Sequence, residues 1–128
     1  MATLHLTEQN FEDTLKKGGI LFIDFWAEWC GPCKAFAPTF EKASETHADI
    51  IFAKVDTDAE QGLAQAFQIQ AIPTLAVFRD GVLVGQNAGA LPGSALEGVI
   101  EQVRKLDMVK IKEEVTKRQA DGENTGTA

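Results

Sequence analysis

The chain has two cysteines, in a Trp-Cys-Gly-Pro-Cys motif at positions 29–33. An apolar run precedes the motif, and the sequence from Lys34 onward predicts a helix. Cys30 is therefore expected at a strand-to-helix turn, where free backbone N–H groups and the helix dipole favour a thiolate. A thiolate attacks disulfides, and Cys33, one turn further on, can close a disulfide with Cys30. The spacing predicts thiol–disulfide exchange.

Three other uses of these cysteines are alternatives to exchange. A structural disulfide this local closes a very short loop and constrains the unfolded chain little. Structural zinc needs four ligands, and the remaining candidates, His5 and His47, have no paired spacing. Two inert buried thiols are disfavoured because the turn, with Trp29 before it and Gly31 and Pro32 inside it, is expected to be exposed. Redox exchange is the favoured interpretation.

The elements around the cysteines alternate between strand and helix patterns and end in a hairpin. This order predicts an α/β fold in which a mixed sheet of about five strands carries helices on both faces. The expected strands are 3–6, 20–27, 50–55, 74–79 and 82–86, and the expected helices are 8–17, 34–47, 60–67 and one from 94 to 106.

Capping residues predict where two of these helices begin. Thr7 is the expected N-cap of the first helix, and Gly18 is expected to help end it. Ser94 and Glu97 have the spacing of a capping box, which predicts that they open the last helix.

Composition limits the classes of function. The chain has 128 residues, enough for one domain with its own core, and a hydrophobic fraction of 45%. A net charge of −7 argues against nucleic acid or an anionic membrane as a partner. No apolar stretch approaches a membrane span, and the first residues lack the pattern of a signal peptide. A cytoplasmic location is expected, where a lone C-x-x-C is more often catalytic than structural.

The last part of the chain has a weaker pattern. Met108, Ile111 and Val115 form a thin apolar stripe among charged residues, which predicts a helical extension of the domain. Residues 121–128 have no apolar anchor and are expected to be disordered. The predicted organisation is therefore a domain at 1–106 and an extension with a tail at 107–128.

Three segments together resemble the thioredoxin family. Asp-Phe-Trp-Ala-Glu-Trp-Cys-Gly-Pro-Cys-Lys at 24–34 resembles its active-site signature. Ala-Ile-Pro-Thr-Leu at 71–75 and Ala-Gly-Ala at 88–90 resemble its second and third landmarks. The agreement in order and spacing extends over 3–106. The resemblance implies the thioredoxin fold and protein-disulfide reductase activity.

The resemblance also implies roles for individual residues. Cys30 is the expected nucleophile and Cys33 the resolving thiol, with Asp24 as proton acceptor and Lys54 as a modulator. Independently, Asp24 is the one ionisable residue in an apolar run, so burial should raise its pKa. The peptide bond before Pro73 is expected to be cis. The expected substrate-binding residues are Trp29, Gly31, Pro32, Ile72, Pro73, Gly89 and Ala90, whereas Trp26 is expected to pack beneath the site.

The implied cycle needs partners but no bound cofactor or metal besides the redox-active Cys30–Cys33 disulfide. The family implies re-reduction by thioredoxin reductase, an NADPH-dependent flavoenzyme, and disulfide-containing client proteins, with the chain itself a monomer. Reduction is favoured over oxidation because no histidine stands between the cysteines. Two alternative hypotheses for the function are a binding module whose redox site is dispensable, and an isomerase or oxidant in an exported compartment.

Overall fold

A five-stranded mixed sheet organises the molecule, for which this computed structural model describes residues 3–120, with side chains up to residue 117. The strands lie in the order β1–β3–β2–β4–β5. β2 is central, pairing in parallel with β3 and antiparallel with β4, while β1 pairs in parallel with β3 and β5 antiparallel with β4. The bounds are β1 (Thr3–His5), β2 (Ile20–Trp26), β3 (Ile51–Asp56), β4 (Thr74–Arg79) and β5 (Val82–Ala88).

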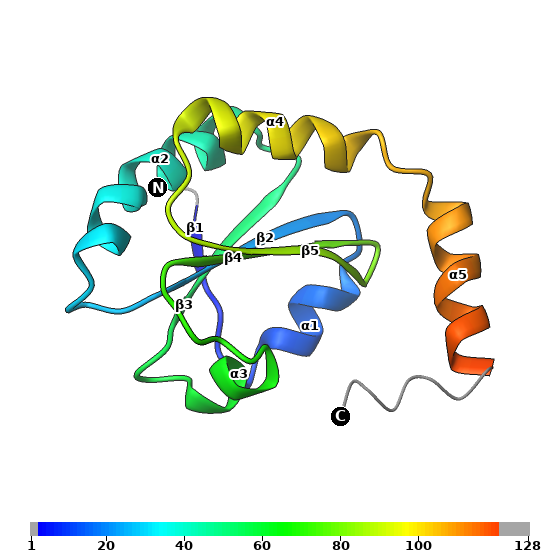
Figure 1. Ribbon diagram of the computed structural model, residues 1–128, viewed down its shortest axis with the longest axis horizontal. Helices are drawn as coiled ribbons and strands as arrows, with labels where there is room; N and C mark the ends of the chain where they lie inside the picture. The colour runs from blue at the N-terminus through cyan, green and yellow to red at the C-terminus, as the bar shows by residue number, and fades with distance from the viewer. Residues whose placement is uncertain (1–2, 121–128) are drawn as a thin grey trace.

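Helices cover both faces of this sheet, which confirms the predicted α/β architecture (Figure 1). Side chains alternate along β2, so Phe22 and Ile23 belong to different hydrophobic clusters on opposite faces. Phe22 packs in the cluster that includes Phe36 and Phe40 of the helix after the cysteines. The helices α2 and α4 lie on that face, and α1 and α3 on the other. Their bounds are α1 (Phe11–Lys16), α2 (Gly31–Thr46), α3 (Gln61–Ala66) and α4 (Gly93–Arg104).

The helix cap predicted at Ser94 is wrong, and Thr7 caps the turn before its helix and not the helix itself. α1 begins at Phe11, and Thr7 instead closes the preceding turn: its backbone N–H donates to Asn10 Oδ1 at 2.7 Å, and Asn10 N–H donates to Thr7 Oγ1 at 3.2 Å. α4 begins at Gly93 after an extended Pro92, and its N-cap makes no side-chain hydrogen bond. Ser94 therefore lies inside the first turn, two positions after the N-cap Pro92, and is too late to cap the helix.

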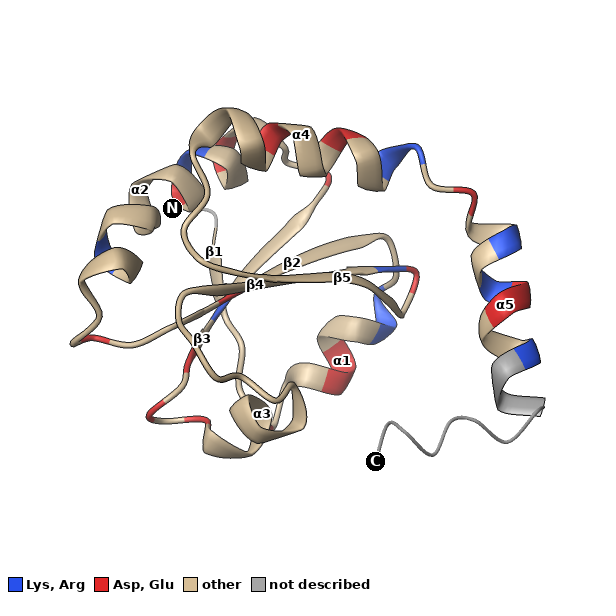
Figure 2. Ribbon diagram, in the orientation of Figure 1, with Lys and Arg blue, Asp and Glu red and all other residues tan. Residues whose placement is uncertain are grey.

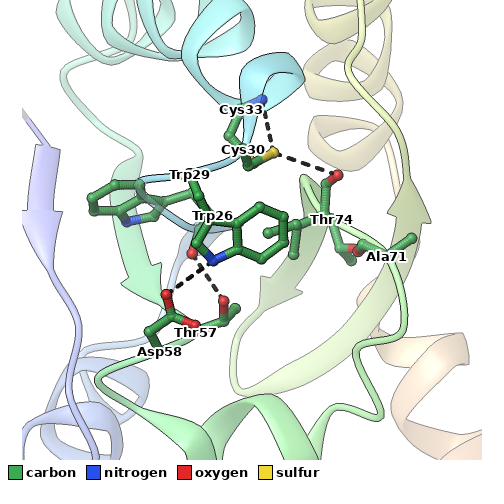
Figure 3. Close-up of a disulfide and its surroundings, with 9 residues drawn as sticks. Trp26, Trp29, Cys30, Cys33, Thr57, Asp58, Ala71 and Thr74 are labelled. Atoms are coloured by element: carbon green, nitrogen blue, oxygen red, sulfur yellow. Dashed lines mark hydrogen bonds between the residues drawn. A yellow bond between two sulfur atoms is a disulfide. The ribbon is translucent and has the colours of Figure 1, made fainter.

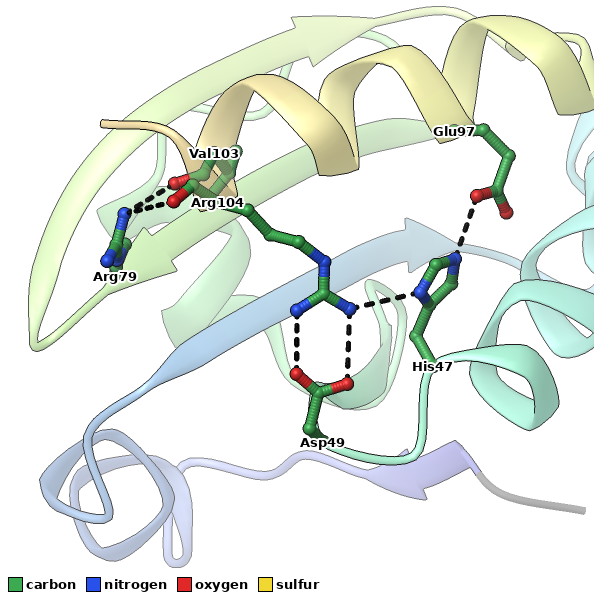
Figure 4. Close-up of polar contacts among 6 residues, drawn as sticks. All are labelled: His47, Asp49, Arg79, Glu97, Val103 and Arg104. Atoms are coloured by element: carbon green, nitrogen blue, oxygen red, sulfur yellow. Dashed lines mark hydrogen bonds and ion pairs between the residues drawn. The ribbon is translucent and has the colours of Figure 1, made fainter.

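A polar cluster joins the end of α2 to α4 (Figure 4). Arg104 donates two hydrogen bonds to the Asp49 carboxylate, at 2.7 and 3.1 Å, and this lowers the pKa of Asp49 to about 2. Arg104 also donates to His47 Nδ1 at 3.1 Å. Since a guanidinium can only donate, His47 Nε2 carries the proton that is donated to Glu97 at 2.8 Å. His47 is the C-cap of α2, at the end of the helix that the sequence predicted for residues 34–47.

The segment after α4 forms a separate helix, α5 (Met108–Ala120), rather than a continuation of α4. Asp107 accepts a hydrogen bond from Lys110 N–H at 3.1 Å and so begins the new helix. α5 lies beside the hairpin end of the sheet and covers neither face (Figure 1). Met108 is buried, while Val109 is 71% exposed. The expected disorder of residues 121–128 concerns a segment outside the described residues.

Candidate active site

Cys30 is the N-cap of α2, where the sequence placed it. Its Sγ accepts a hydrogen bond from Cys33 N–H at 3.1 Å, and the two sulfur atoms are joined in a disulfide (Figure 3). Gly31 and Pro32 form the first turn between them, where proline is well tolerated because its missing N–H would have no helical partner. The helix N-terminus therefore points a backbone donor at Cys30 sulfur, and this donor stabilises a thiolate after reduction.

The cysteines are more covered than the sequence suggested. Trp29 is 71% exposed, and Gly31 and Pro32 are exposed as expected. Cys30 and Cys33, however, are only 4% and 3% exposed, so the argument that an exposed turn implies accessible cysteines was wrong. Ala27, Trp26 and Ile72 pack around them. A partner sulfur must therefore reach Cys30 through the small part of its surface that is exposed.

The loop before β4 forms the opposite wall of the site. The Ile72–Pro73 peptide bond is cis, as expected, and the Ile72 carbonyl oxygen lies 3.7 Å from Cys30 Sγ. Within residues 3–120, neither backbone polar group of Ile72 is paired with another backbone group. Gly89 N–H donates to Pro73 O at 2.8 Å, and Gly89 has a φ of 105°, which favours glycine. The structure thus brings Ile72, Pro73 and Gly89 together, with exposed Ala90 next in the chain.

Asp24 is fully buried under the site. It occupies the same face of β2 as Phe22, the face that α2 covers. Burial raises the pKa of Asp24 to about 7, an effect that the positive charge of Lys54 partly opposes. Lys54 lies directly opposite Asp24 in the parallel pairing of β2 with β3. Neither carboxylate oxygen has a hydrogen-bond partner among the described residues, which leaves the group free to exchange a proton.

Sequence reasoning missed Asp58, whose carboxylate accepts a hydrogen bond from Trp29 Nε1 at 3.0 Å (Figure 3). The neighbouring Thr57 donates its side-chain hydroxyl to the Trp26 carbonyl at 3.1 Å. Both residues belong to the acidic segment that follows β3 (Figure 2). The available signal was topological: β2 and β3 are parallel, so their carboxyl ends and the loops after them meet at one edge. Asp58 fixes the orientation of an exposed indole beside the disulfide.

Within residues 3–120, no group of three or more histidine, cysteine, aspartate or glutamate residues is arranged to hold a metal ion. No helix in the same part of the chain combines the length and the apolar character needed to cross a membrane.

Cys30 and Cys33 lie at a helix N-terminus, opposite a cis-proline and near a buried carboxyl group. This arrangement is suited to the exchange of a dithiol for a disulfide. The family model described as Thioredoxin matches residues 2–102. The chain therefore belongs to the thioredoxin family, and it is a protein-disulfide oxidoreductase that works through Cys30 and Cys33.

Individual relatives support this assignment. The chain is 51% identical over 119 residues to a putative thioredoxin 2 of Streptomyces coelicolor, covering 93% of this chain and 89% of that protein. It is 40% identical over 103 residues to a thioredoxin of Staphylococcus saprophyticus, covering 80% and 98% of the two chains.

Solved structures show the same fold. A mutant thioredoxin from Halobacterium salinarum superposes with a TM-score of 0.76 at 33% identity, covering 81% of this chain and 92% of that one. A chain from a structure on thiol resolution in a yeast mitochondrial 1-Cys peroxiredoxin, through the glutathione and thioredoxin systems, gives 0.73 at 34% identity, covering 79% and 95%. The fold is the thioredoxin fold.

Proposed function

We propose that this protein reduces client disulfides with Cys30 as the attacking thiol and Cys33 as the resolving thiol. The Cys30 thiolate attacks one sulfur of the client disulfide, forming a mixed disulfide and expelling the other client sulfur as a thiolate. The Cys33 thiolate then attacks Cys30 sulfur, which releases the second client thiol. The observation that carries this order is the hydrogen bond from Cys33 N–H to Cys30 Sγ at the start of α2, because it stabilises a negative charge on Cys30.

Asp24 is the proposed proton acceptor for Cys33. A base is most useful when its pKa lies near the working pH, and burial raises the pKa of Asp24 to about 7. Taking the proton from Cys33 converts that residue into the thiolate needed for the second step. Lys54 modulates this transfer through its charge, which favours the ionised carboxylate.

Clients are proposed to bind in an extended conformation across the disulfide. The backbone groups of Ile72, which pair with no other backbone group among residues 3–120, can form strand-like hydrogen bonds with such a segment. The rim opposite the cysteines has little side-chain bulk at Gly89 and Ala90, which allows another backbone to approach. The proposed binding residues are those of the turn and of the two facing loops: Trp29, Gly31, Pro32, Ile72, Pro73, Gly89 and Ala90.

Thioredoxin reductase, an NADPH-dependent flavoenzyme, is the proposed partner that reduces the Cys30–Cys33 disulfide again. The protein is proposed to act in the cytoplasm, as a monomer and without a resident cofactor. Family membership supports this partner, because electrons must be returned to the disulfide after each turnover. The similar chain from the yeast structure on thiol resolution in a 1-Cys peroxiredoxin supports proteins with reactive cysteines as clients. Gly31 and Pro32 between the cysteines support reduction, because no histidine stabilises the dithiol there.

Reduction of insulin disulfides tests this function. With dithiothreitol as the electron source, the protein is expected to accelerate precipitation of the insulin B chain severalfold, and a Cys30→Ser, Cys33→Ser double variant is expected to match the rate without protein. A thioredoxin reductase with NADPH should replace dithiothreitol. Equal rates for wild type and the double variant would contradict the proposal.

We propose a domain at residues 1–106 with an extension at 107–128, and truncation tests this boundary. Removing 119–128 is expected to leave the melting temperature and insulin reduction unchanged. Removing 107–128 should cost about 1–2 kcal/mol of stability, since it exposes the site that buried Met108 covers, while activity persists. Loss of activity in the shorter protein, or a change from dimer to monomer by light scattering, would show that α5 belongs to the working unit.

A further inference from the structure

The ammonium group of Lys54 lies over an aromatic ring, not on the carboxylate opposite it. Lys54 and Asp24 are paired across β3 and β2, so their side chains start as neighbours on one face of the sheet. Lys54 Nζ nevertheless lies 5.1 Å from the centroid of the Trp26 ring. Among the described residues, Asp24 makes no ion pair and neither of its oxygens accepts a hydrogen bond.

The ring of Trp26 competes with Asp24 for this cation. An ammonium within about 6 Å of an indole centroid is attracted by the negative face of the ring. Trp26 follows Asp24 by two residues on β2, so both side chains are on the face that Lys54 shares. A direct contact between Lys54 and Asp24 would strongly favour the carboxylate anion and so weaken the group as a base.

We propose that Trp26 is a positioning residue that holds the Lys54 ammonium away from the Asp24 carboxyl group. The inference rests on the proposed role of Asp24 as proton acceptor and adds a residue that sets the strength of that base. Trp26 also packs against the cysteines, but in this role it acts on Asp24 through Lys54.

The other surroundings of Asp24 leave Lys54 as the controlling charge. β4 places Leu75 opposite Asp24. α2 covers the face with Cys33, Phe36 and Phe40, and the inward residues of α4 are apolar. Lys54 is also the charged group whose field acts on the pKa of Asp24. Among the described residues, Lys54 is therefore the charged group that acts on Asp24; Asp56 lies two residues further along β3, opposite Trp26, and Cys33 of α2 becomes titratable after reduction.

The test measures the pKa of Asp24 directly in the oxidised protein, by carbon-13 NMR of its carboxyl group, with Asp24→Asn to assign the signal. Trp26→Leu removes the ring and is expected to lower this pKa by about one unit, the smallest effect typical of a close opposite charge. Trp26→Phe keeps an aromatic face and is expected to leave the pKa near that of the wild type.

A double-variant cycle separates the cation from simple hydration of the carboxyl group. Removing the ring also admits water, which lowers the pKa of Asp24 whether or not Lys54 is present. We therefore expect Trp26→Leu to lower the pKa much less in a Lys54→Met background. An equal decrease in both backgrounds, or an increase when Lys54 is present, would overturn the proposal. Trp26→Met replaces the leucine variant if that protein does not fold.

Two further measurements distinguish a failure of this inference from a failure of the proposed role of Asp24. In wild-type protein, the Lys54 side-chain protons are expected to show an upfield ring-current shift that Trp26→Leu abolishes, and an unshifted signal would overturn the contact. The pH midpoint of mixed-disulfide resolution should follow the NMR pKa across the variants. If the NMR cycle shows the coupling but the midpoint stays fixed, Trp26 positions Lys54 as proposed and Asp24 is not the proton acceptor.

Discussion

Replacing Cys33 with serine is expected to abolish catalytic turnover while leaving the first step intact. Cys30 retains its place at the N-cap of α2, where the backbone N–H of residue 33 still stabilises its thiolate. A client disulfide is therefore attacked as before, but no second thiol is present to attack Cys30 sulfur. Mass spectrometry after mixing with an excess of oxidised client should show one client joined to each molecule, and insulin reduction should fall to the background rate.

The matched control is Cys30→Ser, which keeps one cysteine at position 33. It is expected to capture little client, because Cys33 lies beyond the helix N-cap and lacks the backbone donor that stabilises a thiolate at position 30. Alkylation of the reduced wild type with a limiting amount of iodoacetamide should label Cys30 first. Preferential labelling of Cys33, or equal capture by both serine variants, would reverse the assignment of attacking and resolving thiols.

Replacing Asp24 with asparagine is expected to make the protein more stable, by an amount that grows with pH. The pKa of Asp24 is raised from 3.8 to about 7 in the folded protein, so the folded state binds more protons than the unfolded state between these values. Wild-type stability therefore falls as pH rises through this window, whereas that of the variant does not. The extra stability of the variant should approach about 4 kcal/mol above pH 7 and vanish near pH 4.

Denaturant unfolding of the oxidised proteins at pH 4, 6 and 8 checks this expectation. The same variant is expected to resolve mixed disulfides about 10²-fold more slowly or worse at neutral pH, the usual contribution of a positioned general base. Asp58→Asn is a control, since Asp58 is exposed and its change should leave the pH dependence of stability unaltered. A less stable Asp24→Asn protein with an unchanged resolution rate would make Asp24 a structural polar residue.

The sequence by itself determined the features that depend on neighbours along the chain. The turn between an apolar strand and a helix placed Cys30 at the N-cap of α2, and the apolar run around Asp24 predicted the burial that raises its pKa. Strand and helix order gave the mixed sheet, because alternation and length are local properties. The start of α1 and the cap at Ser94 were wrong, since a capping residue fixes a helix start only when the backbone around it agrees.

Only the tertiary structure decided which distant segments meet at the disulfide. The near-complete burial of Cys30 depends on Ile72, 42 positions further along the chain, and the orientation of Trp29 depends on a hydrogen bond to Asp58. The position of the Lys54 ammonium over Trp26, and not on Asp24, likewise depends on which side chains strand pairing brings within its reach. These contacts follow from the register and packing of the assembled sheet, which no local pattern in the sequence specifies.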